Sequence, residues 1–581
     1  MMMSRSIPRA YLILIVLLCP VGMAAQSLTQ NSISTIAKSD PLIITGAIGT
    51  QNTFYNSSMG TGYRSPWENT LSANLNIQLY GISMPFAFYY SNNNSSFSFP
   101  HFSFHIDPTY KNWRAHIGRS SMGMSSYIMN MSFNGIGLEY NDAKLRAGIF
   151  YGELRNAIND DPTDPSARSP QYRRMGWGLK VGYGAGQNYL DLYLLSAKDR
   201  QNSLNEYWQQ MINPMENVAV GLKGGLGVTR WLSLRGNLGF SAFTHDYRAE
   251  RIKSPTLDKW DKIFEARYSS LMRIAGDISA NLRLKNFNTQ ISYRMVQPDY
   301  TTLGLYYVSN NYQSLGINMS TSLFKKLSLS ANFSGQEDNI TRNQLYTTRG
   351  FVYSASASMP INQRLQVAAS YSGYRQVQSD GRAHVNDTIR IDRLMNSLTL
   401  TPSYSLTGDH YDHIFSLSAS YTENKDLNKF SNGESDVKTM AAGLSYSLGL
   451  KDWEMDVTSS LSHQQSKGYN TKYTSDVLSV STGRSFLKEK NLSVSAGLSL
   501  CYNDVENQQQ MLSIGADVTA GYTLKDHVFS FSANFNKYSD TNLSTDMYSY
   551  GASEITLSVG YTYTFSLMEI KRKAEKKKDT Q

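Results

Sequence analysis

Apolar and polar residues alternate along most of this chain with a period of two. The alternation is unbroken from Ile555 to Phe565, where every second residue is apolar and the residues between are Thr, Ser or Gly. A β-strand points successive side chains to opposite faces, so such a segment has one apolar and one polar face. Many repeats of this pattern are typical of a membrane-spanning β-barrel, whose outer face meets lipid. The sequence therefore predicts an all-β chain of this kind.

Tight turns and longer polar loops separate the alternating segments in regular order. Tight turns occur, for example, at residues 141–142 and 449–452, and longer loops at residues 153–172 and 298–312. Outer-membrane barrels show this order because their periplasmic turns are short and their extracellular loops are long. Every hairpin can therefore be given the same orientation across the membrane.

The strand count follows from this order. Counting from Leu42 to Phe565 predicts a transmembrane antiparallel up-and-down β-barrel of about 26 strands. The fourth and fifth strands, near residues 99–106 and 113–118, are short, so about 24 strands is the alternative. An even number places both termini in the periplasm.

The N-terminus has the pattern of a secretory signal peptide. Arg5 and Arg9 precede an apolar stretch that is too short to span a bilayer, and small residues follow up to Ala25. A soluble β-sandwich or β-solenoid is the alternative fold, but an exported chain with aromatic strand ends favours the barrel. We expect a signal peptide at 1–25, a short N-terminal periplasmic segment at 26–41, the barrel at 42–566 and a basic periplasmic tail at 567–581.

The amino-acid composition is typical of a single repetitive fold. The 581 residues include 39 Tyr and 41 Gly but only 15 Pro, which suits a sheet with one apolar and one wet face. The net charge is +9, yet the basic residues are dispersed outside the tail, so we expect no nucleic-acid partner. After the signal peptide the only cysteine is Cys501, which excludes an internal disulfide and a cysteine-rich metal site.

Familiar catalytic motifs do not occur in the sequence. There is no Gly-x-Ser-x-Gly, no His-Glu-x-x-His and no phosphate-binding glycine loop. We therefore predict no catalytic residue, no cofactor and no metal site. A barrel enzyme whose site is assembled from residues distant in sequence remains an alternative.

Ionisable residues are concentrated on the predicted lumen face of the first half of the barrel. Seven cations accompany three acidic residues and one histidine there. Such a face can concentrate anions, or the charges can simply pair across neighbouring strands. The predicted lumen charge face consists of Arg114, His116, Glu139, Arg146, Lys180, Asp191, Lys223, Arg235, Asp277, Arg283 and Arg294.

The second half of the predicted lumen face is almost uncharged. Ser, Gly and Ala recur at every second position, as at Ser354, Ser356 and Ser358. These residues either form a simple polar lining or allow close approach by an inserted loop or partner segment. A wall of about 26 strands would be roughly 50 Å wide, too wide for side chains to fill. With about 16 residues before the first strand, too few for a separate plug domain, we expect occlusion by inward-folded loops, a flattened cross-section or another protein.

Several motifs in the stretch Phe102–Tyr140 resemble a poorly characterised group of Bacteroidota outer-membrane β-barrels, and the likeness covers about the first 240 residues. The resemblance implies the fold and the compartment but no activity and no catalytic positions. The basic tail beyond Phe565 departs from barrels that end on an aromatic residue. The motifs are Asp107-Pro108-Thr109-Tyr110-Lys111, Trp113, His116-Ile117-Gly118, Ser126-Tyr127 and Gly135-Ile136-Gly137-Leu138.

Together these features predict an outer-membrane transport channel, or the membrane component of a transport or secretion assembly. Its partners would be outer-membrane lipid and a plug or partner protein in the lumen or at the periplasmic face. A non-conducting structural or adhesin-like surface barrel is the first alternative, and a barrel-embedded enzyme is the second. The sequence names no solute and no oligomeric state.

Overall fold

The computed structural model describes residues 42–58, 60, 65–79, 82–92, 102–163, 168–253, 264–487, 489–506, 509–540 and 551–570. The predicted signal peptide, the predicted N-terminal segment and residues 571–581 of the predicted tail lie outside the described residues. The strands are β1 (Leu42–Ser57), β2 (Trp67–Leu79), β3 (Ile82–Ser91), β4 (Phe102–Ile106), β5 (Thr109–Tyr110), β6 (Trp113–Ser120), β7 (Phe133–Asn141), β8 (Leu145–Arg155), β9 (Arg173–Ala185), β10 (Asn188–Arg200), β11 (Glu216–Gly227), β12 (Leu232–Thr244), β13 (Ser270–Arg283), β14 (Phe287–Val296), β15 (Tyr312–Leu323), β16 (Leu327–Asp338), β17 (Tyr346–Pro360), β18 (Leu365–Asp380), β19 (Asp392–Thr407), β20 (Tyr411–Asp426), β21 (Val437–Leu450), β22 (Met455–Lys467), β23 (Lys472–Phe486), β24 (Leu492–Val505), β25 (Gln509–Leu524), β26 (His527–Asp540) and β27 (Ala552–Ile570).

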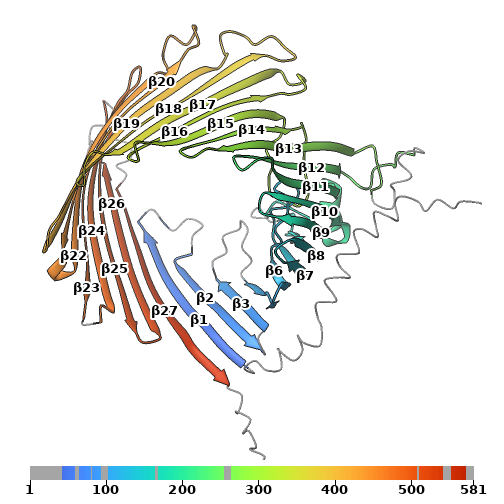
Figure 1. Ribbon diagram of the computed structural model, residues 1–581, viewed down its shortest axis with the longest axis horizontal. Coiled ribbons are helices and arrows are strands. Elements are labelled where there is room, and N and C mark those ends of the chain that lie inside the picture. The colour runs from blue at the N-terminus through green and yellow to red at the C-terminus, as the bar shows by residue number, and fades with distance from the viewer. Residues whose placement is uncertain are drawn as a thin grey trace, which may run out of the picture.

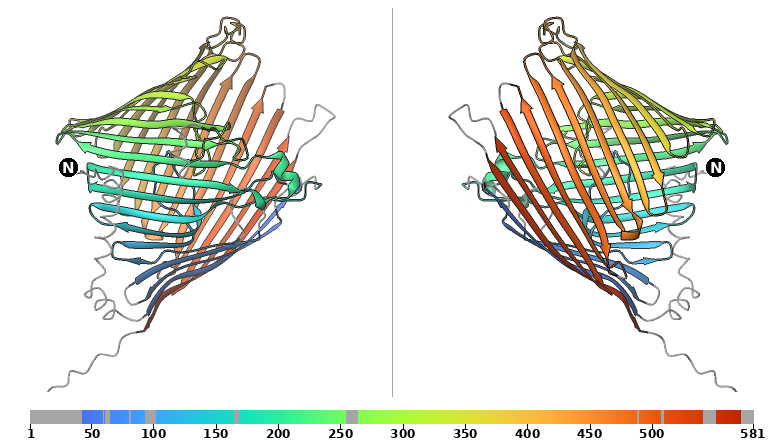
Figure 2. Two further views of the ribbon diagram at one scale, coloured as in Figure 1. Left: turned by 90° about the vertical axis from the view of Figure 1, so that its right-hand side faces the viewer. Right: turned by 90° about the vertical axis from the view of Figure 1, so that its left-hand side faces the viewer.

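The strands form one closed antiparallel barrel (Figure 1). Consecutive strands pair with each other, and the last strand, β27, pairs with β1 along almost its whole length, which closes the sheet. Figure 2 shows that the strands run obliquely, as closure of a β-barrel requires. β27 continues to Ile570, beyond the barrel end predicted at residue 566, because β1 still supplies a partner there in Leu42.

The strand count agrees with the sequence pattern. Two of the 27 strand segments, β4 and β5, occupy a single position between β3 and β6, so the barrel has 26 strand positions. Pro108 lies at the interruption and lacks the backbone N–H that an unbroken ladder needs. Instead, the carbonyl of Pro108 accepts from the amide of Ala115 at 2.8 Å. The predicted 26-stranded barrel is confirmed.

Connections alternate between the two ends of the barrel. Long loops join β6 to β7, β8 to β9, β10 to β11, β12 to β13 and β14 to β15 at one end, here called the long-loop rim. Short turns join the pairs between these at the other end, the short-turn rim. In an antiparallel barrel all connections of one kind lie at the same end, because each strand reverses the chain direction. The predicted order of short turns and long loops is therefore correct along most of the barrel. The connections after β22 and β24 are exceptions, since they are no longer than the turns after β21 and β23.

Helical structure within the described residues is limited to three short segments in connections. They are α3 (Glu206–Met211) and the single 3₁₀ turns η1 (Gln201–Ser203) and η3 (Lys451–Trp453). Asn205 caps α3 by accepting a hydrogen bond from the amide of Trp208 at 2.9 Å. No helix in this described part of the chain is both long and apolar enough to cross a membrane.

The two faces of the wall differ as the alternation predicts. On β7 the side chains of Ile136 and Leu138 are exposed, whereas Phe133 and Glu139, on the other face, are buried. Exposed apolar residues recur in this way from strand to strand, which is the composition of a lipid-facing outer surface. The opposite face, with its glycines, hydroxyls and charges, is therefore the inner face. Apolar burial is concentrated on the inner face of β7 to β14.

Candidate functional site

Two loops lie against this part of the inner face and pair with each other. The first inward loop (residues 121–132) joins β6 to β7, and the second inward loop (residues 297–311) joins β14 to β15. Met129 and Gly304 form an isolated parallel bridge, and the amide of Asn130 donates to the Gly304 carbonyl at 3.0 Å. Although the loops are more than 160 residues apart in sequence, they form one inserted unit.

Side chains strengthen the pairing of the inward loops. The hydroxyl of Tyr300 donates to the carbonyl of Tyr127 at 2.7 Å, and the hydroxyl of Thr302 donates to the carbonyl of Ile128 at 2.7 Å. Tyr300 and Ile128 are completely buried. Each buried carbonyl in these pairs is therefore satisfied, which burial requires.

The wall provides polar partners for the inserted unit. The hydroxyl of Tyr127 donates to the Asp277 carboxylate at 2.7 Å, and the hydroxyl of Ser241 donates to the carbonyl of Thr301 at 2.6 Å. Burial, followed by the contact with Asp277, raises the pKa of Tyr127 well above its usual value. The phenol therefore remains protonated and remains a donor. The contact fixes the first inward loop to β13.

Two glycines of the wall make room for the inward loops. A Cβ on Gly221 would lie 2.6 Å from Cγ1 of Ile128, and a Cβ on Gly239 would lie 2.5 Å from the hydroxyl oxygen of Tyr300. The residues beside Gly221, Val220 and Leu222, are exposed on the outer face. The loops thus approach the wall backbone from the inside, at positions where any larger side chain would displace them.

The predicted lumen charge face divides into paired and unpaired groups. Arg146 pairs with Asp191 at 2.8 Å, and Lys180 pairs with Glu139 at 2.5 Å. His116 is buried between two carboxylates, with its Nδ1 3.1 Å from Asp107 and its Nε2 3.5 Å from Glu139. Ion pairing across strands, one of the two interpretations of this face, therefore applies here.

Four predicted cations have no acidic partner. Within the described residues no ion pair forms at Arg114, Lys223, Arg235 or Arg283, and all four are exposed. Each lies within five residues of the short-turn rim. The remaining cation, Arg294, lies opposite Asp277 in the register of β13 and β14. Because the three acidic residues are already engaged in contacts, positive charge remains on the inner wall near the short-turn rim.

The hydroxyl-rich half of the inner wall is open. Ser330, Ser356 and Ser418 are exposed. Ser330 pairs with the hydroxyl of Ser356 at 2.6 Å, and Ser418 donates to the carbonyl of Gly443 at 3.4 Å. The inward loops lie against the charged half of the wall instead. The small residues of the second half therefore act as a polar lining in the described structure.

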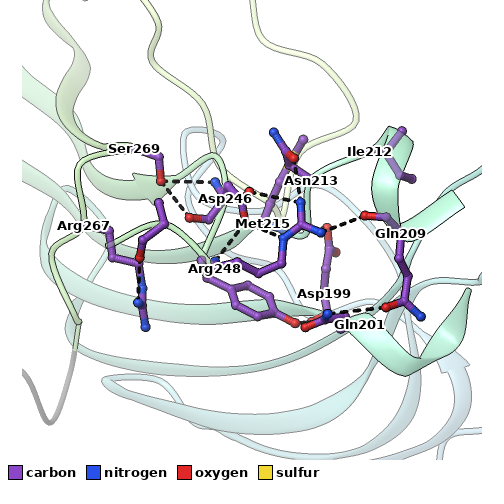
Figure 3. A network of polar contacts seen from close by, with 12 residues as sticks. Asp199, Gln201, Gln209, Ile212, Asn213, Met215, Asp246, Arg248, Arg267 and Ser269 are labelled. Carbon is purple, nitrogen blue, oxygen red and sulfur yellow. Dashed lines mark hydrogen bonds and ion pairs between the residues drawn. The ribbon is translucent and has the colours of Figure 1, made fainter. Parts of the chain in front are cut away.

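A polar network fixes the long-loop rim beside the inward loops (Figure 3). Asp199, 1% exposed, accepts from the Arg174 guanidinium at 2.8 and 3.2 Å and from the amide of Met215 at 3.2 Å. The buried charge of Asp199 is thus paired and hydrogen-bonded, as a buried carboxylate must be. The network joins β9 and β10 to the loop that follows β10.

Arg248 connects that loop to the rim loop between β12 and β13. Its guanidinium donates to the Asp246 carboxylate at 2.9 and 3.0 Å, to the Gln209 carbonyl at 2.7 Å and to the Asn213 side chain at 2.7 Å. The hydroxyl of Ser269 donates to the carbonyl of Asp246 at 2.8 Å. Figure 3 shows these groups converging from both loops on Arg248. The rim loops are therefore held to each other as well as to the wall.

Strand periodicity gives no indication of the first inward loop or of the tyrosines that bind it. The sequence nevertheless contains a signal for this loop. The segment that joins β6 to β7 is rich in apolar residues, which would be exposed to water if the loop extended into solvent. These residues pack into the inner core with Phe133, Phe150 and Leu195. They are Met122, Met124, Ile128 and Met129.

Possible metal ligands are scattered in the part of the chain that the structure describes. No group of three or more His, Cys, Asp or Glu side chains in that part of the chain is arranged to hold a metal ion. The single described cysteine, Cys501, is a free thiol.

This chain has only distant similarity to known proteins. No protein-family model matches the chain, and no curated protein matches it. Among solved structures, the translocation pore of the P pilus usher PapC has 11% identity over 90% of this chain and 100% of that chain, with a TM-score of 0.37. OccK8 (OprE) of Pseudomonas aeruginosa has 11% identity over 68% of this chain and 98% of its own, with a TM-score of 0.31. OccAB3 of Acinetobacter baumannii has 13% identity over 68% and 99%, with a TM-score of 0.31. At such scores the likeness carries no argument about function, and the resemblance to Bacteroidota barrels stays a prediction.

Proposed function

We propose that this chain is an outer-membrane channel that transports hydrophilic solutes. The observation that carries the proposal is the uneven lining of the barrel. The inward loops lie against only one part of a wall with 26 strand positions, whereas the hydroxyl-rich part and the cations near the short-turn rim are exposed. A wide barrel with a polar, uncovered inner wall supports passage of water and solutes.

The membrane location rests on the outer face. Large apolar side chains are exposed there on strand after strand, and aromatic rings lie near the strand ends, as where His527 stacks on Tyr563 at the short-turn rim. Such a surface is stable against lipid and unstable in water. With the predicted signal peptide, this supports insertion in the bacterial outer membrane, with lipid as the partner of the outer face and both termini in the periplasm.

The unpaired cations support a preference for anions. Lys223 and Arg235 lie on neighbouring strands, both exposed and neither in an ion pair with a described residue. Uncompensated positive charge on a pore wall raises the local concentration of anions and lowers that of cations. Anions should therefore permeate more readily than cations of the same size.

A partner protein in the lumen is the second candidate function. The inward loops occupy only one part of the wall, so the remaining polar surface could contact a segment of a transport or secretion assembly. In that case the isolated barrel would conduct freely, and addition of the partner would close it. An adhesin-like scaffold or a barrel enzyme would require no conductance.

Planar-bilayer recording of the purified full chain tests the channel. We expect a steady conductance with a permeability ratio that favours chloride over potassium. The double variant Lys223→Gln, Arg235→Gln should lower this ratio at unchanged strand structure. The matched control is Arg168→Gln, which removes a cation paired with Asp160 in a loop at the long-loop rim. Absence of conductance from folded protein, detected by its resistance to unfolding in cold detergent, would overturn the proposal.

A further inference from the structure

A groove on the inner wall near the short-turn rim is not used by the inward loops. It crosses the inner face of β13 to β17 and has a volume of about 980 Å³. Arg283 and Lys285 lie at one end of the groove, and Ser354 lies at the other. The volume is at the upper end of the range for small-molecule sites, so the groove has room for a ligand larger than an inorganic ion.

Strand register places carboxamides side by side across this groove. Asn281 is opposite Gln290, Gln290 is opposite Asn318, and Asn318 is opposite Asn332. Four neighbouring strands thus present one row of carboxamides at the same height. Each carboxamide offers both a donor and an acceptor. A row of such groups suits a ligand that carries several hydroxyls.

The carboxamides of the groove differ in how far their hydrogen-bonding groups are already used. The side-chain nitrogen of Asn281 is buried and has no hydrogen-bond partner in the described residues. The side-chain nitrogen of Asn332 donates to the side-chain oxygen of Asn318, so these two carboxamides are partly engaged with each other. A buried amide without a partner is unfavourable, so a ligand acceptor that reached Asn281 would supply the missing hydrogen bond.

The charge of the groove is positive and unbalanced. Arg283 and Lys285 line it, and no acidic and no aromatic side chain occurs among its described lining residues. Neutral sugars are held mainly by stacking on aromatic rings, which this lining does not provide. Guanidinium and ammonium groups instead favour a carboxylate, sulfate or phosphate group.

A second polar pocket, at the long-loop rim, shows the difference between structural and available amides. There Gln297 accepts from the amide of Ile274 at 2.8 Å, and Asn311 accepts from the amide of Ile340 at 3.0 Å. Those side chains hold loop backbone in place, and Asp299 adds a negative charge. Among the described residues, the carboxamides of the groove near the short-turn rim hold no loop backbone in place, and no acidic side chain lines that groove.

We propose that this groove is a binding site for an acidic oligosaccharide, with its charged group on Arg283 and Lys285 and its hydroxyls along the carboxamide row. The inference deepens the proposed channel function by naming the class of solute. Its position near the short-turn rim would place the solute at the periplasmic mouth. Binding itself requires no conductance, so the site and the channel can be tested separately.

Isothermal titration calorimetry on the full chain in detergent tests the site, with linear trigalacturonic acid as the probe. We expect saturable binding of trigalacturonic acid and none of maltotriose, a neutral trisaccharide. Arg283→Gln should weaken binding by about tenfold or more, because it removes a charge-assisted hydrogen bond. Asn288→Ala, an exposed carboxamide in the groove, should weaken it by a smaller factor. Arg364→Gln is the matched control, since Arg364 is exposed in a turn outside the groove.

The outcomes separate the two proposals. Equal binding of maltotriose, equal binding of inorganic sulfate, or unchanged binding in Arg283→Gln would each overturn the acidic-saccharide site. Binding without conductance in a planar bilayer would support the site and overturn the channel. Conductance without binding of trigalacturonic acid would support the channel and overturn the site.

Discussion

Replacing Tyr300 with Ala should release both inward loops from the wall. The Tyr300 side chain is completely buried and packs with Tyr127, Ala275 and Val296, and its hydroxyl donates to the Tyr127 carbonyl at 2.7 Å. Removing a buried aromatic ring costs about 3–5 kcal/mol, including the space left behind. Because each 1.4 kcal/mol is about a factor of ten, the detached population should rise by about a hundred-fold to a few thousand-fold.

Amide hydrogen exchange followed by mass spectrometry measures this release directly. The amide of Asn130, in the first inward loop, donates to the carbonyl of Gly304 in the second. Loss of Tyr300 in one loop should therefore accelerate exchange in the other loop, while exchange in the strands of the wall stays slow. Bilayer recordings of the same variant should show additional conductance levels, since the loops would leave and rejoin the wall.

Tyr307→Ala provides the matched control. Tyr307 belongs to the same loop but is 80% exposed, so its removal should leave exchange and conductance as in the unmodified protein. If Tyr300→Ala leaves exchange of residues 121–132 unchanged in a folded barrel, the inward loops are not coupled through this contact. Equal effects of the two substitutions would also refute the reasoning, because burial would then be irrelevant.

Two further predictions concern the wall and the rim. Gly178→Ala should destabilise the barrel by about 1–3 kcal/mol, because the new Cβ would lie 2.3 Å from the buried Phe150 ring. The temperature at which the protein loses its compact electrophoretic mobility should fall, whereas Gly236→Ala, with its nearest atom at 3.8 Å, should leave it unchanged. At the rim, burial raises the pKa of Asp246, but hydrogen bonds from Arg248 outweigh it, so the pKa is lowered overall. The resulting stabilisation is present above about pH 4 and is lost as the pH falls through the depressed pKa, so proteolysis of the rim loops should accelerate there. Arg248→Met should weaken this pH dependence without removing it, because the backbone amide of residue 248 still donates to the Asp246 carboxylate.

The local alternation of apolar and polar residues, with the order of turns and loops, was sufficient to predict the architecture. The alternation from Ile555 to Phe565 became part of β27, and the order of tight turns and long loops gave the correct number of strand positions. This works because the side-chain period of a strand is a local property, and a barrel repeats one local unit. The interruption between β4 and β5 occurs where Pro108 breaks the ladder, in the region that the pattern marked as weak.

The same local pattern placed charged residues on the inner face but did not decide their partners. Arg146 and Lys180 form ion pairs, whereas Lys223, although directly opposite Asp191 in the register, forms none. Which cation an acidic side chain reaches depends on side-chain direction across several strands, and Asp191 already contacts Arg146. The sequence therefore determined which charges line the interior, and the packed structure decided which of them remain available.

The sequence by itself determined the strands, their two faces and the alternation of their connections, because each depends on neighbours along one strand or turn. Only the tertiary structure decided that residues 121–132 and 297–311 meet inside the barrel on Gly221 and Gly239. It also brought Asn281 into one row with the carboxamides of three later strands. These arrangements depend on contacts between residues far apart in the chain, which periodicity within a single strand does not encode.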